Sequence, residues 1–219
     1  MLEEDVKSRV KGTFLEDKPI LRTSVRTGEG VEALREALHD LTLHAEEKSA
    51  RTPFRLPIDR VFSVDGFGTI VTGTLIDGHI AVGDEAQLMP LGNQCRVRNL
   101  QVHGRDVSAV YAGQRAAVNL AGIKKESISR GDVLCRTDSM QPSLMLDVKL
   151  QNLPDSKRII ESGSRLHLYH GAAVRLAKAV LLDRDALRPG ESCYAQLRLS
   201  EALAARQGDC CLLYTSPSP

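Results

Sequence analysis

At 219 residues, with 42% hydrophobic and 26% charged side chains, the chain can bury a core and is too apolar for intrinsic disorder. Its formal net charge of +1 excludes a general electrostatic attraction to nucleic acid, so any RNA binding has to come from local patches of charge. The longest apolar runs fall short of the roughly 18 residues of a membrane span, and the N-terminus is charged rather than signal-like, which predicts a cytoplasmic protein with no membrane partner.

Residues 1–50 have the pattern of one α/β unit. PILRTSV, residues 19–25, predicts a short strand, a glycine turn follows, and residues 31–48 carry apolar side chains at helical spacing. A single strand and helix cannot cover a sheet edge or bury both faces of the strand. We therefore expect this segment to be the C-terminal remnant of a larger α/β domain.

From residue 52 onward the pattern is β-rich. Residues 52–136 contain short alternating segments separated by aspartate-glycine turns, which predicts a small β-barrel. Residues 143–209 repeat this pattern and predict a second barrel, which we expect to be truncated. Residues 210–219, CCLLYTSPSP, show no period-two alternation and resemble translated sequencing-adaptor sequence, so we interpret them as a non-native tail without a strand.

The motifs of nucleotide hydrolysis are missing from this sequence. Gly68-TIVT-Gly73 has the glycine spacing of a phosphate-binding loop, but Thr74 follows where that loop needs a lysine, so we interpret it as a strand. There is no N-K-x-D motif for guanine and no signature of a catalytic nucleophile. The chain alone is therefore predicted to be inactive as an enzyme.

Histidines and cysteines give no metal-binding pattern. His167 and His170 are three residues apart on a predicted strand, which places them on opposite faces, so exposed strand positions are the better interpretation. The five cysteines lack a C-x-x-C spacing, which disfavours a zinc site and a disulfide framework. No metal is expected.

One longer stretch resembles a known family. RLPIDRVFSVDGFGTIVTGTLIDGHIAVGDE is similar to the second domain of elongation factor Tu-like translation GTPases, with the same elements in the same order. Within that group IDRVF, AGQRAAVNLAGI, RGDVLC, LHLYHGAA and YAQLRLSEALAARQGD resemble the bacterial selenocysteine-specific elongation factors. The resemblance runs from about residue 10 to residue 209. It implies a mainly β fold of two consecutive barrels, translation-factor domains II and III, after the C-terminal α/β remnant of a P-loop GTPase domain.

The resemblance also implies a binding site for an amino acid. Domain II of this family holds the aminoacyl end of a tRNA, and Asp59, Arg60 and Arg115 match residues of the selenocysteine pocket. A selenol is largely ionised at neutral pH while a serine side chain is neutral, so arginines can distinguish the two by charge. Neighbours on a regular strand point to opposite faces, so Asp59 and Arg60 can share a pocket only at a strand end or a bulge.

Further residues follow from the same resemblance. Ser24 and Val25 match the guanine-contact motif of the GTP-binding domain, with valine in place of the usual alanine. Four basic residues are candidate contacts to the tRNA backbone, although a solvated outer face explains the first two equally well: Arg96, Arg98, Lys124 and Lys125.

The implied function is delivery of selenocysteinyl-tRNA to the ribosome for selenocysteine incorporation. The expected partners are this tRNA, the ribosome and, through C-terminal winged-helix domains outside this chain, a messenger hairpin. GTP with Mg²⁺ is expected in the full-length parent and no cofactor in this chain, which we expect to be a monomer. Two alternatives stay open: an elongation factor Tu-like or initiation factor 2-like protein that handles ordinary aminoacyl-tRNA, and a non-catalytic β-barrel interaction module.

Overall fold

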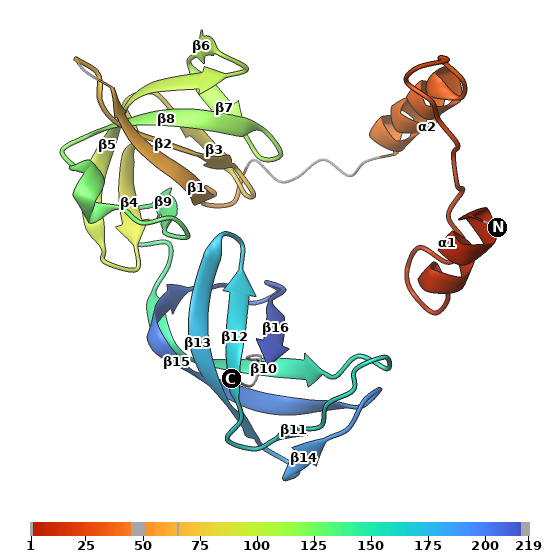
Figure 1. The fold of residues 1–219 in the computed structure, drawn as a ribbon. Helices are drawn as coiled ribbons and strands as arrows, with labels where there is room; N and C mark the ends of the chain where they lie inside the picture. The colour runs from red at the N-terminus through yellow and green to blue at the C-terminus, as the bar shows by residue number, and fades with distance from the viewer. Residues whose placement is uncertain (1, 45–50, 65, 216–219) are drawn as a thin grey trace. The chain divides into compact units, whose positions relative to one another are not determined.

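The computed structural model describes residues 2–44, 51–64 and 66–215. The chain is mainly β, as predicted, and divides into a helical N-terminal part and a larger β part that begins near residue 48 (Figure 1). Among the described helices, none combines the length and the apolarity needed to cross a lipid bilayer.

The N-terminal part contains α1 (Leu2–Val10) and α2 (Val31–Leu43). Helix α2 confirms the predicted helix as far as Leu43, and residues 45–48 lie outside the described residues. The strand predicted at residues 19–25 is wrong, because no strand forms there. A strand needs a neighbour for its backbone N–H and C=O groups, and the described residues of this part contain no second strand.

The first β module is a closed six-stranded antiparallel barrel, in the order β4-β9-β1-β2-β8-β5, which closes because β4 also pairs with β5. Short strands β3, β6 and β7 and a 3-10 turn, η1, extend its rim. Their bounds are β1 Arg55–Val64, β2 Gly68–Thr74, β3 His79–Ala81, β4 Glu85–Met89, β5 Asn93–Val102, β6 Arg105–Val107, β7 Ala109–Tyr111, β8 Arg115–Ala121, η1 Lys125–Ser127 and β9 Val133–Arg136.

Along each strand, side chains alternate between the inside and the outside of the barrel, and those that point inward fill its core. Leu56 and Ile58 of β1 and Val71 of β2 are fully buried, while residues between them point outward. Each such side chain removed from water contributes about 1.5–3 kcal/mol. The period-two pattern in the sequence therefore corresponds directly to the inner and outer faces of the barrel.

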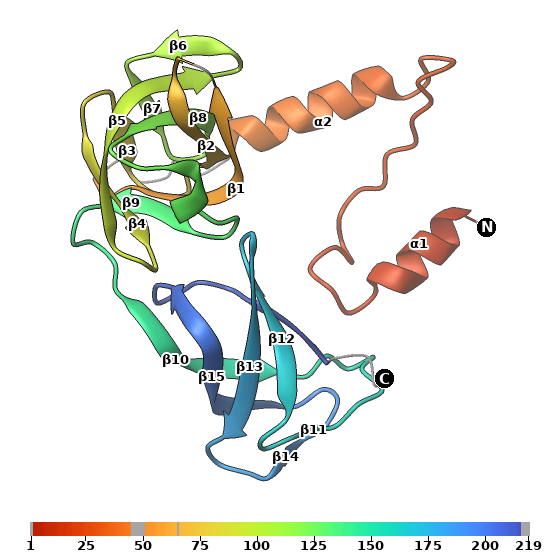
Figure 2. The ribbon, with the colours of Figure 1, turned by 60° about the vertical axis from the view of Figure 1, so that its left-hand side comes forward.

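The second β module is a five-stranded antiparallel sheet in the order β10-β15-β13-β12-β16, beside the short pair β11–β14; Figure 2 shows the β12–β13 hairpin along its length. Strands β10, β12, β13 and β15 occupy the predicted β region, and the module has its own buried core. The bounds are β10 Pro142–Gln151, β11 Ile160–Glu161, β12 Arg165–His170, β13 Ala173–Leu181, β14 Ala186–Leu187, β15 Ser192–Ala204 and β16 Leu212–Thr215.

Strand β16 contradicts the expectation that residues 210–219 contain no strand. Its residues pair antiparallel with β12, from Leu166 opposite Thr215 to Tyr169 opposite Leu212. The free edge of β12 offers unpaired backbone groups, and an apolar segment can pair with them without period-two alternation. That residues 210–219 are non-native stays a prediction.

A buried arginine, Arg55 of β1, joins the two β modules. Its Nε donates to Asp77 Oδ2 at 2.9 Å and its Nη1 donates to Asp209 Oδ2 at 2.7 Å. The same Asp209 oxygen lies 2.9 Å from His170 Nε2 and accepts from the Arg206 backbone N–H. Burial would raise the pKa of Asp209, but these hydrogen bonds, chiefly from Arg55, lower it to about 2. The prediction that His170 is exposed is wrong, because its side chain is only 11% exposed and pairs with Asp209.

Apolar and backbone contacts reinforce this junction. A small buried cluster mixes side chains of both modules: Met89, Val133, Cys135, Met140 and Ala204. Gly131, with φ of 94°, lies so close to Ala173 of β13 that a Cβ added at Gly131 would be 2.5 Å from the Ala173 Cα. Only glycine fits there, so the loop before β9 and the start of β13 are in direct backbone contact.

Replacing Asp209 with asparagine removes one of the two carboxylates that pair with Arg55. Breaking a buried ion pair costs about 3–5 kcal/mol, and because Asp77 stays in place we expect the lower end, about 3 kcal/mol of unfolding free energy at pH 7. Urea denaturation of the two chains measures this difference. Asp183→Asn is the control, because it breaks an exposed pair with Arg184 and should leave the urea midpoint nearly unchanged.

The stabilising effect of Asp209 should depend on pH. Its pKa is about 2 in the folded chain, against about 3.9 for an unfolded aspartate. A carboxylate with a depressed pKa stabilises fully above its unfolded pKa and loses that effect as the pH falls through its folded pKa. The wild-type advantage over Asp209→Asn should therefore shrink between about pH 4 and about pH 2. An advantage of equal size at pH 7 and pH 2 would contradict the assigned ion pair.

Candidate functional site

The site is built on a β-bulge in β1. Ile58 pairs with Gly73 of β2, and Arg60 pairs with the next residue, Thr72, so Asp59 is the extra residue between them. A bulge changes the direction of the side chains around it. Asp59 and Arg60 can therefore lie at one site. The sequence predicted that these neighbours share a pocket only at a strand end or a bulge, and a bulge is present.

Gly73 makes this bulge possible. A Cβ added at Gly73 would lie 2.2 Å from the carbonyl oxygen of Pro57 and 2.7 Å from Cδ2 of Leu56. A side chain at this position would push β2 away from the part of β1 that leads into the bulge. Gly73, which matches the glycine spacing of a phosphate-binding loop in the sequence, thus allows β1 and β2 to approach each other closely.

Asp59 is held by two neighbouring strands. Both Nη atoms of Arg115, on β8, donate to the two carboxylate oxygens of Asp59, with Nη2 3.0 Å from Oδ1. The Thr72 hydroxyl donates to Oδ1 at 2.8 Å. The hydrogen bonds from Arg115 are the main cause that lowers the pKa of Asp59, and the nearby charge of Arg60 adds to it. Asp59 is therefore a fixed, ionised acceptor, and its partner is Arg115 rather than Arg60.

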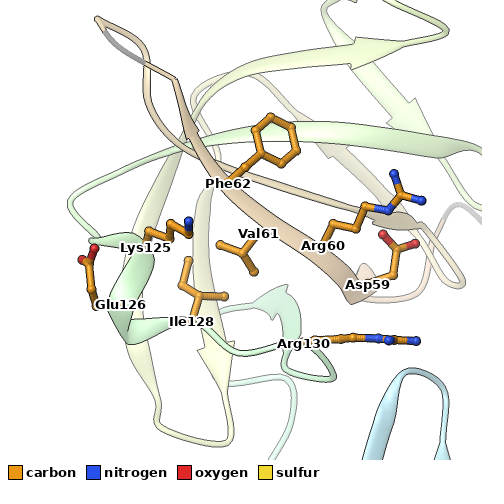
Figure 3. A pocket seen from close by; sticks show the side chains of 8 residues that line it. All are labelled: Asp59, Arg60, Val61, Phe62, Lys125, Glu126, Ile128 and Arg130. Atoms are coloured by element: carbon orange, nitrogen blue, oxygen red, sulfur yellow. The ribbon is translucent and has the colours of Figure 1, made fainter.

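Beside Asp59 and Arg60 lies an open cavity of about 790 Å³, which we call the β1 cavity. In Figure 3 apolar side chains separate a group around Arg60 and Arg130 from a group around Lys125 and Glu126. The full lining comprises Asp59, Arg60, Val61, Phe62, Lys125, Glu126, Ile128 and Arg130. Such a volume is typical of a site for a whole small ligand.

The other candidate contacts are scattered. Arg96 and Arg98 are both exposed on the outer face of β5, where Arg96 Nε donates to the Gly83 carbonyl at 3.1 Å. Lys124 and Lys125 are exposed at η1, and only Lys125 lines the β1 cavity. The structure thus brings Asp59, Arg60, Arg115 and Lys125 together and leaves the other basic candidates apart from this group.

Ser24 and Val25 lie in a tight turn of the N-terminal part. The Ser24 N–H donates to the Glu29 carbonyl at 2.9 Å, the Ser24 carbonyl accepts from the Gly28 N–H at 2.8 Å, and the Val25 side chain is 97% exposed. The amide of Ser24 is already used by the turn, and the sequence has no lysine-bearing phosphate loop. Ser24 therefore has no free backbone N–H for a guanine, and the guanine contact of Ser24 and Val25 stays a prediction.

Sequence reasoning missed two residues of the site. Thr72 is the second hydrogen-bond donor to Asp59, and Arg130 lines the β1 cavity from the loop before β9. A strand pattern gives no signal for Thr72, because the bulge decides which residue lies beside Asp59. Arg130 belongs to an arginine-glycine-aspartate turn. In the sequence this turn indicated only where the first barrel ends, and nothing in it pointed to a cavity.

The Asp59–Arg115 pair can be tested by carboxyl NMR. Arg115→Ala should raise the pKa of Asp59 toward its ordinary value, because the main stabiliser of the carboxylate is gone. Thr72→Val should raise it less, since a neutral donor is lost. The lowered pKa of Asp106 depends on Gln101 and Asn99 and serves as an internal reference that should not move. An unchanged Asp59 pKa in Arg115→Ala would rule out the pair.

Known proteins resemble this chain in sequence and in structure. The family model for elongation factor Tu domain 2 matches residues 68–135. A selenocysteine-specific elongation factor of Desulfomicrobium baculatum is 38% identical over 213 residues, which cover 97% of this chain and 34% of that protein. One of Escherichia coli K12 is 34% identical over 183 residues, 83% of this chain and 29% of that protein. The chain thus spans about a third of the length of these two curated relatives.

A solved structure agrees with these sequence matches. The apo form of translation elongation factor SelB from Methanococcus maripaludis has a TM-score of 0.85 and 26% identity, covering 99% of this chain and 51% of that chain. The likeness therefore extends over the N-terminal part and both β modules. The chain is a homologue of the selenocysteine-specific elongation factors and carries an elongation factor Tu domain 2 at residues 68–135.

Proposed function

We propose that this chain binds the aminoacyl end of selenocysteinyl-tRNA, as the amino-acid-selecting part of a translation elongation factor. The observation that carries the proposal is the β1 bulge, which brings a fixed carboxylate, Asp59, and an unpaired cation, Arg60, to one cavity. Selenocysteine esterified to tRNA needs a site with both a negative and a positive group, because its free amino group is cationic and its selenolate side chain is anionic.

Arg60 is the residue that would contact the selenolate. Among the described residues it has no hydrogen-bond or ion-pair partner, whereas Arg115 is occupied by Asp59. A hydrogen bond to a charged group is worth about 1.5–3 kcal/mol net, which corresponds to roughly ten- to a hundredfold in affinity. A neutral serine side chain would not gain this energy.

Asp59 would receive the amino group of the aminoacyl ester. Arg115 and Thr72 fix the carboxylate and keep it ionised, so it accepts a further hydrogen bond without reorganising. Since Arg115 largely compensates the charge of Asp59, the carboxylate does not repel the selenolate strongly. This division gives Asp59 a positioning role and leaves discrimination to Arg60.

The function of the whole protein is part of the same proposal. We infer a GTP-dependent factor that delivers selenocysteinyl-tRNA to the ribosome, with a messenger hairpin as a further partner. This rests on the curated relatives, which are selenocysteine-specific elongation factors about three times as long as the matched segment. GTP binding with Mg²⁺ is assigned to the parts of such a factor that this chain does not match.

Arg60→Ala should reduce the preference for selenocysteinyl-tRNA over seryl-tRNA by roughly ten- to a hundredfold, because seryl-tRNA makes no use of the lost charge. Filter binding of both charged tRNAs to the wild-type and variant chains measures this ratio. Arg60→Lys should restore part of the preference, since it keeps a point charge but loses the planar fork.

Arg136→Ala, on β9 and outside the β1 cavity, is the matched control and should leave the ratio unchanged. Equal affinity of the wild-type chain for seryl- and selenocysteinyl-tRNA would overturn the proposed selectivity. That result would favour the alternative of a factor for ordinary aminoacyl-tRNA.

A further inference from the structure

The barrel module has another cavity at the end where β1 and β4 begin and β9 ends, which we call the mouth cavity. Its volume is about 540 Å³, which is in the range of sites for a small ligand, and such sites often lie in the mouths of β-barrels. Its charged and aromatic lining comes from the segment before β1 (residues 51–54), His79, Asp84, Glu85 and Arg136. No residue lines both cavities, so the mouth cavity is a different site from the β1 cavity.

Backbone contacts fix the segment before β1 on two sides of the mouth cavity. The Arg136 N–H donates to the Phe54 carbonyl at 3.3 Å, which ties this segment to β9. On the other side, a Cβ added at Gly78 would lie 2.3 Å from the carbonyl oxygen of Thr52. Only glycine lets β3 begin so close to this segment. The wall is therefore formed before any ligand binds, which lowers the entropy cost of binding.

Opposite charges lie on different sides of the mouth cavity. Asp84 and Glu85 lie on the β4 side, where Asp84 Oδ2 accepts from the Ala81 N–H at 2.8 Å. Arg136 and Arg51 lie on the β9 and β1 side. In the part of the chain that the structure describes, the side chains of Glu85 and Arg136 have no hydrogen-bond or ion-pair partner. A matching ligand has an anionic group at one end and hydrogen-bond donors at the other.

An aromatic ring and an apolar floor complete the lining. His79 of β3 belongs to the lining, and its imidazole stacks on Tyr111 of β7 with the ring centroids 6.0 Å apart. Tyr111 is not part of the lining and supports the imidazole from β7. Phe54, which is only 4% exposed, adds an apolar surface. Bases of nucleotides stack on such rings, including the imidazole of histidine.

We propose that the mouth cavity binds a nucleotide unit, with its phosphate at Arg136, its ribose hydroxyls at Glu85 and its base against His79. A nucleotide combines the three groups that this lining calls for: an anion, two hydroxyl donors and a flat ring. Arginine binds a phosphate through two parallel N–H donors, and a carboxylate accepts from ribose hydroxyls. This site is additional to the proposed aminoacyl site and involves none of its residues.

Isothermal titration calorimetry of the full 219-residue chain with 5′-AMP and adenosine tests the phosphate contact. AMP should bind roughly ten- to a hundredfold more tightly than adenosine, because only AMP makes the charged contact. Arg136→Ala should abolish this difference and leave the affinity for adenosine unchanged, and Arg136→Lys should restore part of it. Arg105→Ala removes an exposed arginine on β6, outside both cavities, and should change neither affinity.

Replacing the imidazole separates stacking from charge. His79→Ala should weaken AMP and adenosine by the same factor, roughly five- to a hundredfold. Inorganic phosphate that binds as tightly as AMP would overturn the proposal, because the base would then contribute nothing. Absence of AMP binding at millimolar concentration would also overturn it, as would an Arg136→Ala chain that still prefers AMP to adenosine.

A short RNA strand shows the source of the nucleotide. A trinucleotide without a terminal phosphate that binds more tightly than AMP, and is weakened by Arg136→Ala, assigns the site to a nucleotide within an RNA strand. Weaker binding than that of AMP assigns it to a free nucleotide. None of these measurements involves seryl- or selenocysteinyl-tRNA, so failure of the nucleotide site and failure of the proposed function are separate results.

Discussion

The buried guanidinium of Arg55 is the interaction on which the geometry of the β part depends. Its side chain is 9% exposed, and a charge so far from water is tolerated only when it is paired and hydrogen-bonded. The two carboxylates come from different modules: Asp77 follows β2 of the barrel, and Asp209 follows β15 of the second sheet. Arg206 Nη1 of the second module also lies 3.6 Å from Asp77 Oδ2, so separating the modules would break two ion pairs and leave the buried guanidinium of Arg55 with one carboxylate.

Strand β1 connects this junction to the candidate site, so the position of Arg55 also fixes the position of the site. Arg55 begins the strand, and the bulge at Asp59 lies four residues later. The turn of Arg130 bonds to Ile58 on one side and touches Ala173 of the second module on the other. The β1 cavity is therefore shaped by both modules, although all residues that line it belong to the first.

How much of this could be predicted from the sequence depends on the range of the interactions. Alternation and glycine turns are local signals, and they correctly gave the main strands of both modules but not β16. The strand at residues 19–25 failed because local propensity says nothing about a missing neighbour. The prediction that His170 is exposed was wrong because its partner, Asp209, is 39 positions away in the sequence, and no local pattern indicates this contact. The bulge could be stated only as a condition for Asp59 and Arg60 to share a site, and the pairing of β1 with β2 was needed to meet it.

A chain of net charge +1 can have a cationic site because its arginines and carboxylates are not paired evenly along the molecule. Its carboxylates are not spread uniformly over the surface: Asp209 is used at the module junction, and Asp59 is used by Arg115. Arg60 and Arg130 face the same cavity without a described partner of their own. Unpaired charges gathered at one cavity produce a local positive potential even when the net charge of the chain is close to zero. Recognition of this kind depends on where an anion is placed in the cavity, and a high overall positive charge is not needed for it.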